Sequence, residues 1–117
     1  MRWVAVFAFV ALAVQLVAVY APGSVASAVE VSIPNIDKVV HLLIFGLPAY
    51  FFARWTGRTW LVAAVFVAHG ALSEFIQGFI PGRDPDVFDF LADAAGVAVA
   101  VVVLIVQGRV RARRALA

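Results

Sequence analysis

The sequence predicts an all-α, polytopic membrane protein that folds as a bundle of four transmembrane helices. Of its 117 residues, 65% are hydrophobic and only 14% are charged, with a mean hydropathy of +1.03. A soluble domain of this size carries roughly 25% charged residues. The apolar residues also gather in four runs, and a helix needs about 20 of them to cross a bilayer. We therefore expect a single membrane domain over residues 1–117.

The first two runs flank a longer polar segment. The first covers residues 3–20 and stops at Ala21-Pro22-Gly23, and the second covers residues 39–55. Cleavage as a signal peptide is the alternative for the first run, because Arg2 precedes it and Ala26-Ser27-Ala28 follows it. The apolar region of a signal peptide is usually only about 7–15 residues long, so we favour a retained helix.

The last two runs are separated by a short turn. The third covers residues 59–80 and ends at Pro81-Gly82, and the fourth covers residues 87–106, ahead of a basic tail at 107–117. Strands are not expected, because the runs are too long and lack the alternation of apolar and polar residues. The four predicted helices thus span residues 3–20, 39–55, 59–80 and 87–106.

Lysines and arginines predict the orientation of the bundle. Two cations, Lys38 and Arg83, fall on one side, and the other side carries Arg2, Arg54, Arg58, Arg109, Arg111, Arg113 and Arg114. The richer side should face the cytoplasm, which places both termini inside and loops 22–38 and 81–86 outside. Because the basic residues lie at helix ends, we interpret the pI near 9.7 as topology and as lipid contact, with no nucleic-acid partner.

Six of the seven acidic residues crowd into three windows at the predicted outer face. The helical rise of 1.5 Å per residue places His41 roughly 6 Å, and Glu74 and Asp93 roughly 10 Å, from that face. Ionisable groups within apolar segments are costly and indicate function. The predicted ligand-binding residues are Asp37, Lys38, His41, Glu74, Gln77, Arg83, Asp89 and Asp93.

The acidic residues of the fourth helix form one stripe. Asp86, Asp89 and Asp93 follow the spacing i, i+3, i+7, and Gly96 and Ala100 continue it with the small side chains that close helix packing needs. The cluster carries excess negative charge, so its carboxylates must pair, take up protons or bind a cation. Arg83 is the expected partner of Glu74 or Asp89, and Lys38 is the second candidate.

Several of these residues also have purely structural interpretations. Asp86 and Asp37 suit helix N-caps, and Asp84 suits the turn. Ser73 can bond to its own helix, and His69 is favoured as a packed or hydrogen-bonded histidine. We expect Gln77 to support Glu74 by a hydrogen bond. Capping cannot explain Asp93, two turns into its helix.

Four short motifs occur in a fixed order: Asp37-Lys38-x-x-His41, Glu74-x-x-Gln77, Arg83, and Asp86 with Asp89. In this order and spacing the chain resembles the VanZ-like family of small integral membrane proteins, over residues 37–100. Asp93, ahead of Gly96, stands where that family usually has a neutral amide. The resemblance implies a multi-pass protein of the bacterial cytoplasmic (inner) membrane and an association with low-level, teicoplanin-type glycopeptide resistance. It implies no agreed reaction.

Three functions are compatible with the sequence. The first is binding of a lipid-linked cell-wall precursor, a peptidoglycan-related ligand or a glycopeptide in the outer leaflet, with Lys38 and Arg83 holding phosphate. The second is a membrane enzyme acting on a lipid head group, with Glu74 and His41 as the catalytic candidates or with a divalent cation as cofactor, although no established metal-ligand spacing occurs. The third is a structural protein or transporter subunit with a buried ion-pair lock. Four helices are few for a carrier unless the chain forms a homo-oligomer.

Overall fold

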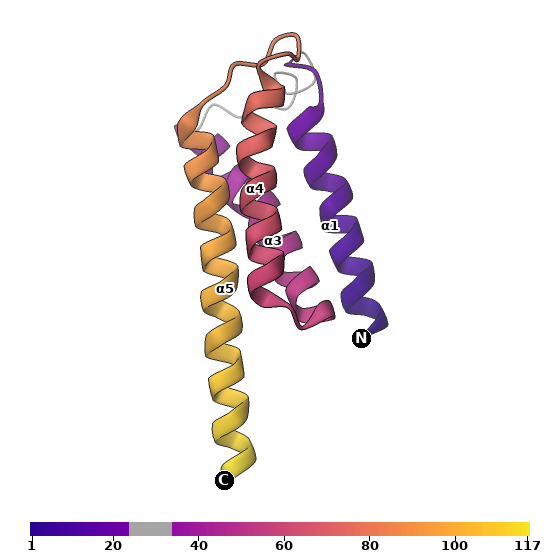
Figure 1. Ribbon diagram of the computed structural model, residues 1–117, viewed down its shortest axis with the longest axis vertical. Helices are drawn as coiled ribbons and strands as arrows, with labels where there is room; N and C mark the ends of the chain where they lie inside the picture. Colours follow the sequence, from indigo (N-terminus) through magenta and orange to yellow (C-terminus); the bar gives the residue numbers. More distant parts are fainter. Residues whose placement is uncertain (24–33) are drawn as a thin grey trace.

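The computed structural model describes residues 1–23 and 34–117, and this part of the chain contains four long α-helices and no strand. Each helix is long and apolar enough to cross a membrane. The predicted fold class is therefore confirmed. The Ala26-Ser27-Ala28 motif lies outside the described residues. The helices are α1 (Arg2–Tyr20), α3 (Ile36–Thr56), α4 (Thr59–Gln77) and α5 (Val87–Leu116) (Figure 1).

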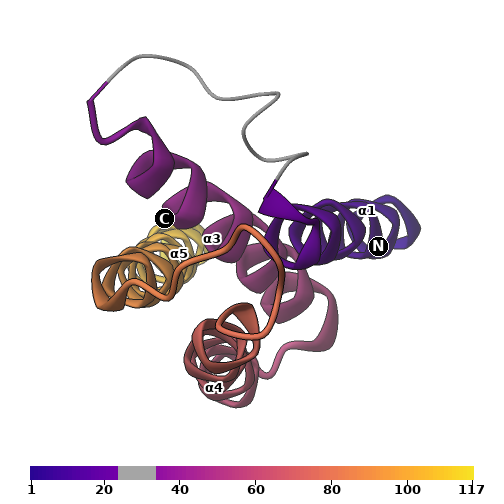
Figure 2. The same ribbon diagram turned by 90° about the horizontal axis from the view of Figure 1, so that it is seen from above.

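Helix α3 occupies the centre of the bundle and packs against all three other helices. Seen from above, α1, α4 and α5 surround it, and α1 and α4 meet over only a short stretch (Figure 2). Segment 78–86 connects α4 to α5 at one end of the bundle, which we call the loop end, and both chain termini lie toward the opposite end (Figure 1). The buried apolar core includes Val19, Phe45, Ala49, Phe66, Val97 and Ala100.

Glycines allow α3 and α5 to approach backbone to backbone. A Cβ built on Gly96 would overlap the carbonyl oxygen of Leu42, and one built on Gly46 would lie 2.9 Å from the carbonyl oxygen of Gly96. One turn further along α5, Ala100 is buried in the core. The predicted small-residue face of α5 is thus confirmed, and it is turned toward α3.

Three helix boundaries differ from prediction by at least three residues, and the first of these is the start of α3, at Ile36 instead of residue 39. Helix α4 ends at Gln77, not at residue 80, because the amides of Phe79 and Ile80 donate to the carbonyls of Ile76 and Gln77 in tighter turns. Helix α5 continues through the basic tail to Leu116, because arginine and alanine are strong helix formers that offset Gly108.

Replacing Gly96 by alanine should destabilise the bundle. The added methyl meets the Leu42 carbonyl, and overpacking of this kind costs about 1–3 kcal/mol. Gly108→Ala is the matched control, since a Cβ there has nothing within 4 Å. That control should gain up to about 1 kcal/mol of helix propensity. Denaturation of both variants by SDS in mixed micelles measures the difference, and equal stability would contradict the close α3–α5 contact.

Candidate functional site

Lys38 joins the first turn of α3 to the start of α5. Its Nζ donates to Asp37 Oδ2 at 2.8 Å, to Asp86 Oδ2 at 2.8 Å and to Asp89 Oδ1 at 2.5 Å. A lysine ammonium has three N–H donors. All three are therefore engaged by carboxylates, which confirms Lys38 as a partner of Asp89.

His41 lies one turn deeper on α3 and faces two acidic residues of α5. Its Nδ1 is 2.7 Å from Asp93 Oδ1, and its Nε2 is 3.6 Å from Asp89 Oδ2. The Asp93 side chain is completely buried, and the His41 side chain is 13% exposed. The stripe predicted on α5 thus faces the polar turn predicted on α3.

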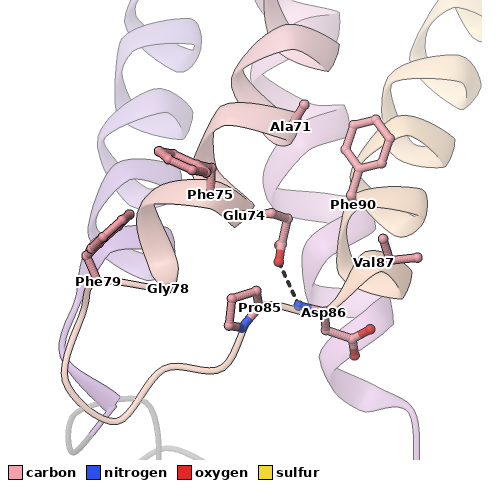
Figure 3. Close-up of a pocket in the computed structure, with 9 residues that line it drawn as sticks. All are labelled: Ala71, Glu74, Phe75, Gly78, Phe79, Pro85, Asp86, Val87 and Phe90. Atoms are coloured by element: carbon pink, nitrogen blue, oxygen red, sulfur yellow. Dashed lines mark hydrogen bonds between the residues drawn. The ribbon is translucent and has the colours of Figure 1, made fainter.

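Glu74 reaches the same place from α4. Its Oε2 accepts a hydrogen bond of 2.9 Å from the backbone amide of Asp86 (Figure 3). Its Oε1 is buried without a hydrogen-bond partner among the described residues, and so is Oδ2 of Asp93. One donor atom each of His41, Glu74 and Asp93 lies within 4.8 Å of the other two. The predicted convergence of three helices on one polar cluster is confirmed.

An open groove of about 760 Å³ runs between α4 and α5 beside this cluster. Its walls carry three phenylalanine rings, and its ionisable lining residues are Glu74 and Asp86 (Figure 3). The groove is thus apolar over most of its surface, with carboxylates at one place. The lining residues are Ala71, Glu74, Phe75, Gly78, Phe79, Pro85, Asp86, Val87 and Phe90.

Asp86 begins α5 and also takes part in the cluster. Its Oδ1 accepts from the amide of Phe88 at 2.8 Å, which confirms the predicted N-cap. The hydrogen bond from Lys38, followed by the one from the Phe88 amide, holds the pKa of the Asp86 carboxyl below its usual range. Asp37, by contrast, is not the N-cap of α3. Asn35 occupies that position, and Asp37 pairs with Lys38.

The prediction that Arg83 pairs with Glu74 or Asp89 is wrong. Its guanidinium donates to the backbone carbonyls of Ala21, at 2.9 Å from Nε, and Ala18, at 2.5 Å. These carbonyls are at the C-terminal end of α1, where the helix leaves acceptors free and carries partial negative charge. Arg83 therefore fastens the α4–α5 connection to α1.

Gln77 also donates a hydrogen bond to the C-terminal end of α1. Its Nε2 donates to the carbonyl of Val19 at 2.9 Å, so the expected support of Glu74 is also wrong. The structural interpretations of two neighbours are confirmed. Ser73 donates to the carbonyl of Gly70 at 2.8 Å, and His69 lies 2.8 Å from the hydroxyl of Tyr20.

Sequence reasoning missed the groove and its aromatic walls. Phenylalanine is common in apolar helices, so Phe75, Phe79 and Phe90 carry no signal on their own. Only the packing of α4 beside α5 places them around Glu74.

In the comparison with known proteins, the family model described as VanZ/LLP1 matches residues 2–108. This range includes α1, α3, α4 and most of α5. No curated protein and no solved structure matches the chain.

A double-mutant cycle distinguishes the two cations. Lys38→Met and Asp89→Asn should show a coupling free energy of roughly 1 kcal/mol, because the two side chains form an ion pair. Arg83→Met and Asp89→Asn should be additive within about 0.5 kcal/mol, because Arg83 binds α1. The free energies of unfolding in mixed micelles give both values. Strong coupling of Arg83 to Asp89 would contradict the observed contacts.

Proposed function

Since the chain belongs to the VanZ/LLP1 family, we propose that it is a cell-envelope protein that binds a lipid-linked or peptidoglycan-related ligand in the groove between α4 and α5. The family is linked to glycopeptide resistance. We propose that the present chain is likewise linked to glycopeptide resistance of the teicoplanin type.

The proposed orientation places the loop end outside the bacterial cytoplasmic membrane. Seven arginines lie at the first residues of α1, around the α3–α4 turn and in the last turns of α5. Positive charge in short segments favours the cytoplasmic side. Both termini are then cytoplasmic, and the groove opens in the outer leaflet, where the head groups of exported lipid-linked intermediates lie.

The groove itself is the observation that carries the proposal. Its apolar walls suit a polyprenyl or acyl chain, because burying apolar surface against phenylalanine rings needs no polar partner. Its carboxylates suit the hydroxyl and amide groups of a sugar or peptide. Glu74 contributes a buried oxygen that has no hydrogen-bond donor within residues 1–23 and 34–117, and leaving such an acceptor unpaired is unfavourable. An amphiphile would satisfy both surfaces at once.

Lys38 and Arg83 contribute to this site by holding it together. The Lys38 donors are taken by three carboxylates, and Arg83 is directed at α1. Direct binding of phosphate by these two cations thus finds no support in their contacts. Recognition in the proposed site runs through acceptors, and the ligand supplies the donors.

A second candidate function, an enzyme acting on the lipid head group, is favoured by the His41–Asp93 pair. An imidazole hydrogen-bonded to a buried carboxylate is the arrangement of a positioned general base, and Glu74 lies beside it on the groove side. Release of a head group from a bound lipid would distinguish this function from binding alone.

Glu74→Gln should weaken binding of a fluorescent polyprenyl-linked peptidoglycan precursor by at least about tenfold. Glutamine keeps one acceptor for the Asp86 amide and removes the charged one, and a hydrogen bond to a charged group contributes about 1.5–3 kcal/mol. Fluorescence anisotropy of the detergent-purified protein measures the Kd. Complementation of a deletion strain should show the same loss in teicoplanin sensitivity.

Two controls accompany this measurement. Asp84→Asn removes an exposed carboxylate at the same end of the bundle and should bind as the wild type does. Phe90→Ala removes a groove wall and should weaken binding, whereas Phe88→Ala, two residues away and outside the groove, should not. Wild-type affinity in both Glu74→Gln and Phe90→Ala would refute the proposed function.

A further inference from the structure

We infer that His41, Glu74 and Asp93 form a binding site for one divalent transition-metal ion at the side of the groove. The inference deepens the proposed function and rests on it only for the ligand that the ion would meet. The site itself consists of the three side chains, which come from α3, α4 and α5.

The first observation is geometric. The three donor atoms lie within 4.8 Å of one another. Donor atoms around a tetrahedral zinc ion lie roughly 3.4 Å apart, as follows from metal–ligand distances of about 2.1 Å. Side-chain shifts of about 1 Å therefore close the three donors onto one ion. The backbones of α3 and α5 need not move, because their glycine contact already holds them close.

The second observation is a pair of orphaned oxygens. Asp93 is completely buried, and its Oδ2 has no hydrogen-bond partner among the described residues. Glu74 Oε1 is buried and lacks a partner in the same way. Buried polar atoms are almost always satisfied, by protein groups, water or an ion. Both of these oxygens belong to residues of the three-residue group, whereas the other two unpartnered buried atoms of the described residues are those of the Gln15 amide on α1.

The third observation is the charge of the surroundings. The carboxylates of Asp37, Asp86 and Asp89 already share the ammonium of Lys38. Glu74 and Asp93 add two further carboxylates, and Arg83 is directed at α1. Negative charge thus exceeds positive charge in a partly buried place, where uncompensated charge is costly. A dication offsets the two carboxylates that Lys38 does not contact.

The donor set indicates the class of ion. One imidazole and two carboxylates suit Zn²⁺ and similar transition metals, whereas Mg²⁺ and Ca²⁺ prefer oxygen ligands throughout. Three protein ligands leave a coordination position open, as catalytic zinc sites do. Glu74 also lines the groove, so a phosphate or carboxylate oxygen of a bound ligand can occupy that position. The ion would supply the positive charge that Lys38 and Arg83 do not offer.

Zinc titration of the full chain in detergent, after treatment with EDTA, tests the inference without any lipid or antibiotic. The wild type should retain one Zn²⁺ per chain after dialysis, and its Tm should rise on adding Zn²⁺ and much less on adding Mg²⁺. Asp93→Asn and Glu74→Gln should each weaken Zn²⁺ binding by at least about tenfold, since each loses a charged ligand. Asp84→Asn, which keeps all three ligands, should match the wild type.

Zn²⁺ binding by the wild type tests the metal site even if a variant folds poorly. Absence of stoichiometric Zn²⁺ in the wild type would overturn the inference in favour of a cluster neutralised by protons. Undiminished Zn²⁺ binding in folded Asp93→Asn, checked by circular dichroism, would overturn it as well. A protein that binds the lipid probe but no metal refutes only the metal site. One that binds Zn²⁺ but not the probe refutes only the proposed function.

Discussion

The close contact between α3 and α5 governs the geometry of the loop end. Gly96 has no side chain, so the Leu42 carbonyl fills the space that a Cβ would occupy. Leu42 follows His41 in the chain, and Asp93 lies one turn before Gly96 on the same face of α5. The contact that brings the backbones together therefore also brings the imidazole within 2.7 Å of the buried carboxylate. A larger residue at this position would separate the very groups that make the site.

The two cations of the loop end hold elements in place. Lys38 binds three carboxylates and joins α3 to α5, and Arg83 binds the end of α1 and joins it to the α4–α5 connection. Gln77 adds a third hydrogen bond to the end of α1. Both cationic side chains of the loop end are thus engaged in contacts that hold the helices together. What remains toward the groove is acidic, and this makes donors or a metal ion the natural complement of the site.

Structural features that depend on the pattern of side chains along the chain could be predicted from the sequence. Long apolar runs predicted the spans, and the spacing of Asp86, Asp89 and Asp93 predicted the face that meets α3. Two of the errors concern residues whose partner is the backbone. Arg83 and Gln77 donate to carbonyls of α1, and every residue has a carbonyl, so nothing in the sequence marks these acceptors. Charge is visible in a sequence, so the pattern of charges predicts a carboxylate as the partner of Arg83.

The sequence by itself determined that apolar helices cross a bilayer and that their ionisable residues gather at one end. The physical reason is local: helix period, hydropathy and the cost of charge in lipid depend on residue type and spacing alone. The tertiary structure alone decided which carboxylate meets which cation, which oxygens have no partner in the part of the chain that the structure describes, and where the groove opens. Those outcomes depend on the rotation and separation of whole helices, which Gly46 and Gly96 permit and which the contacts of α1 with Arg83 and Gln77 complete.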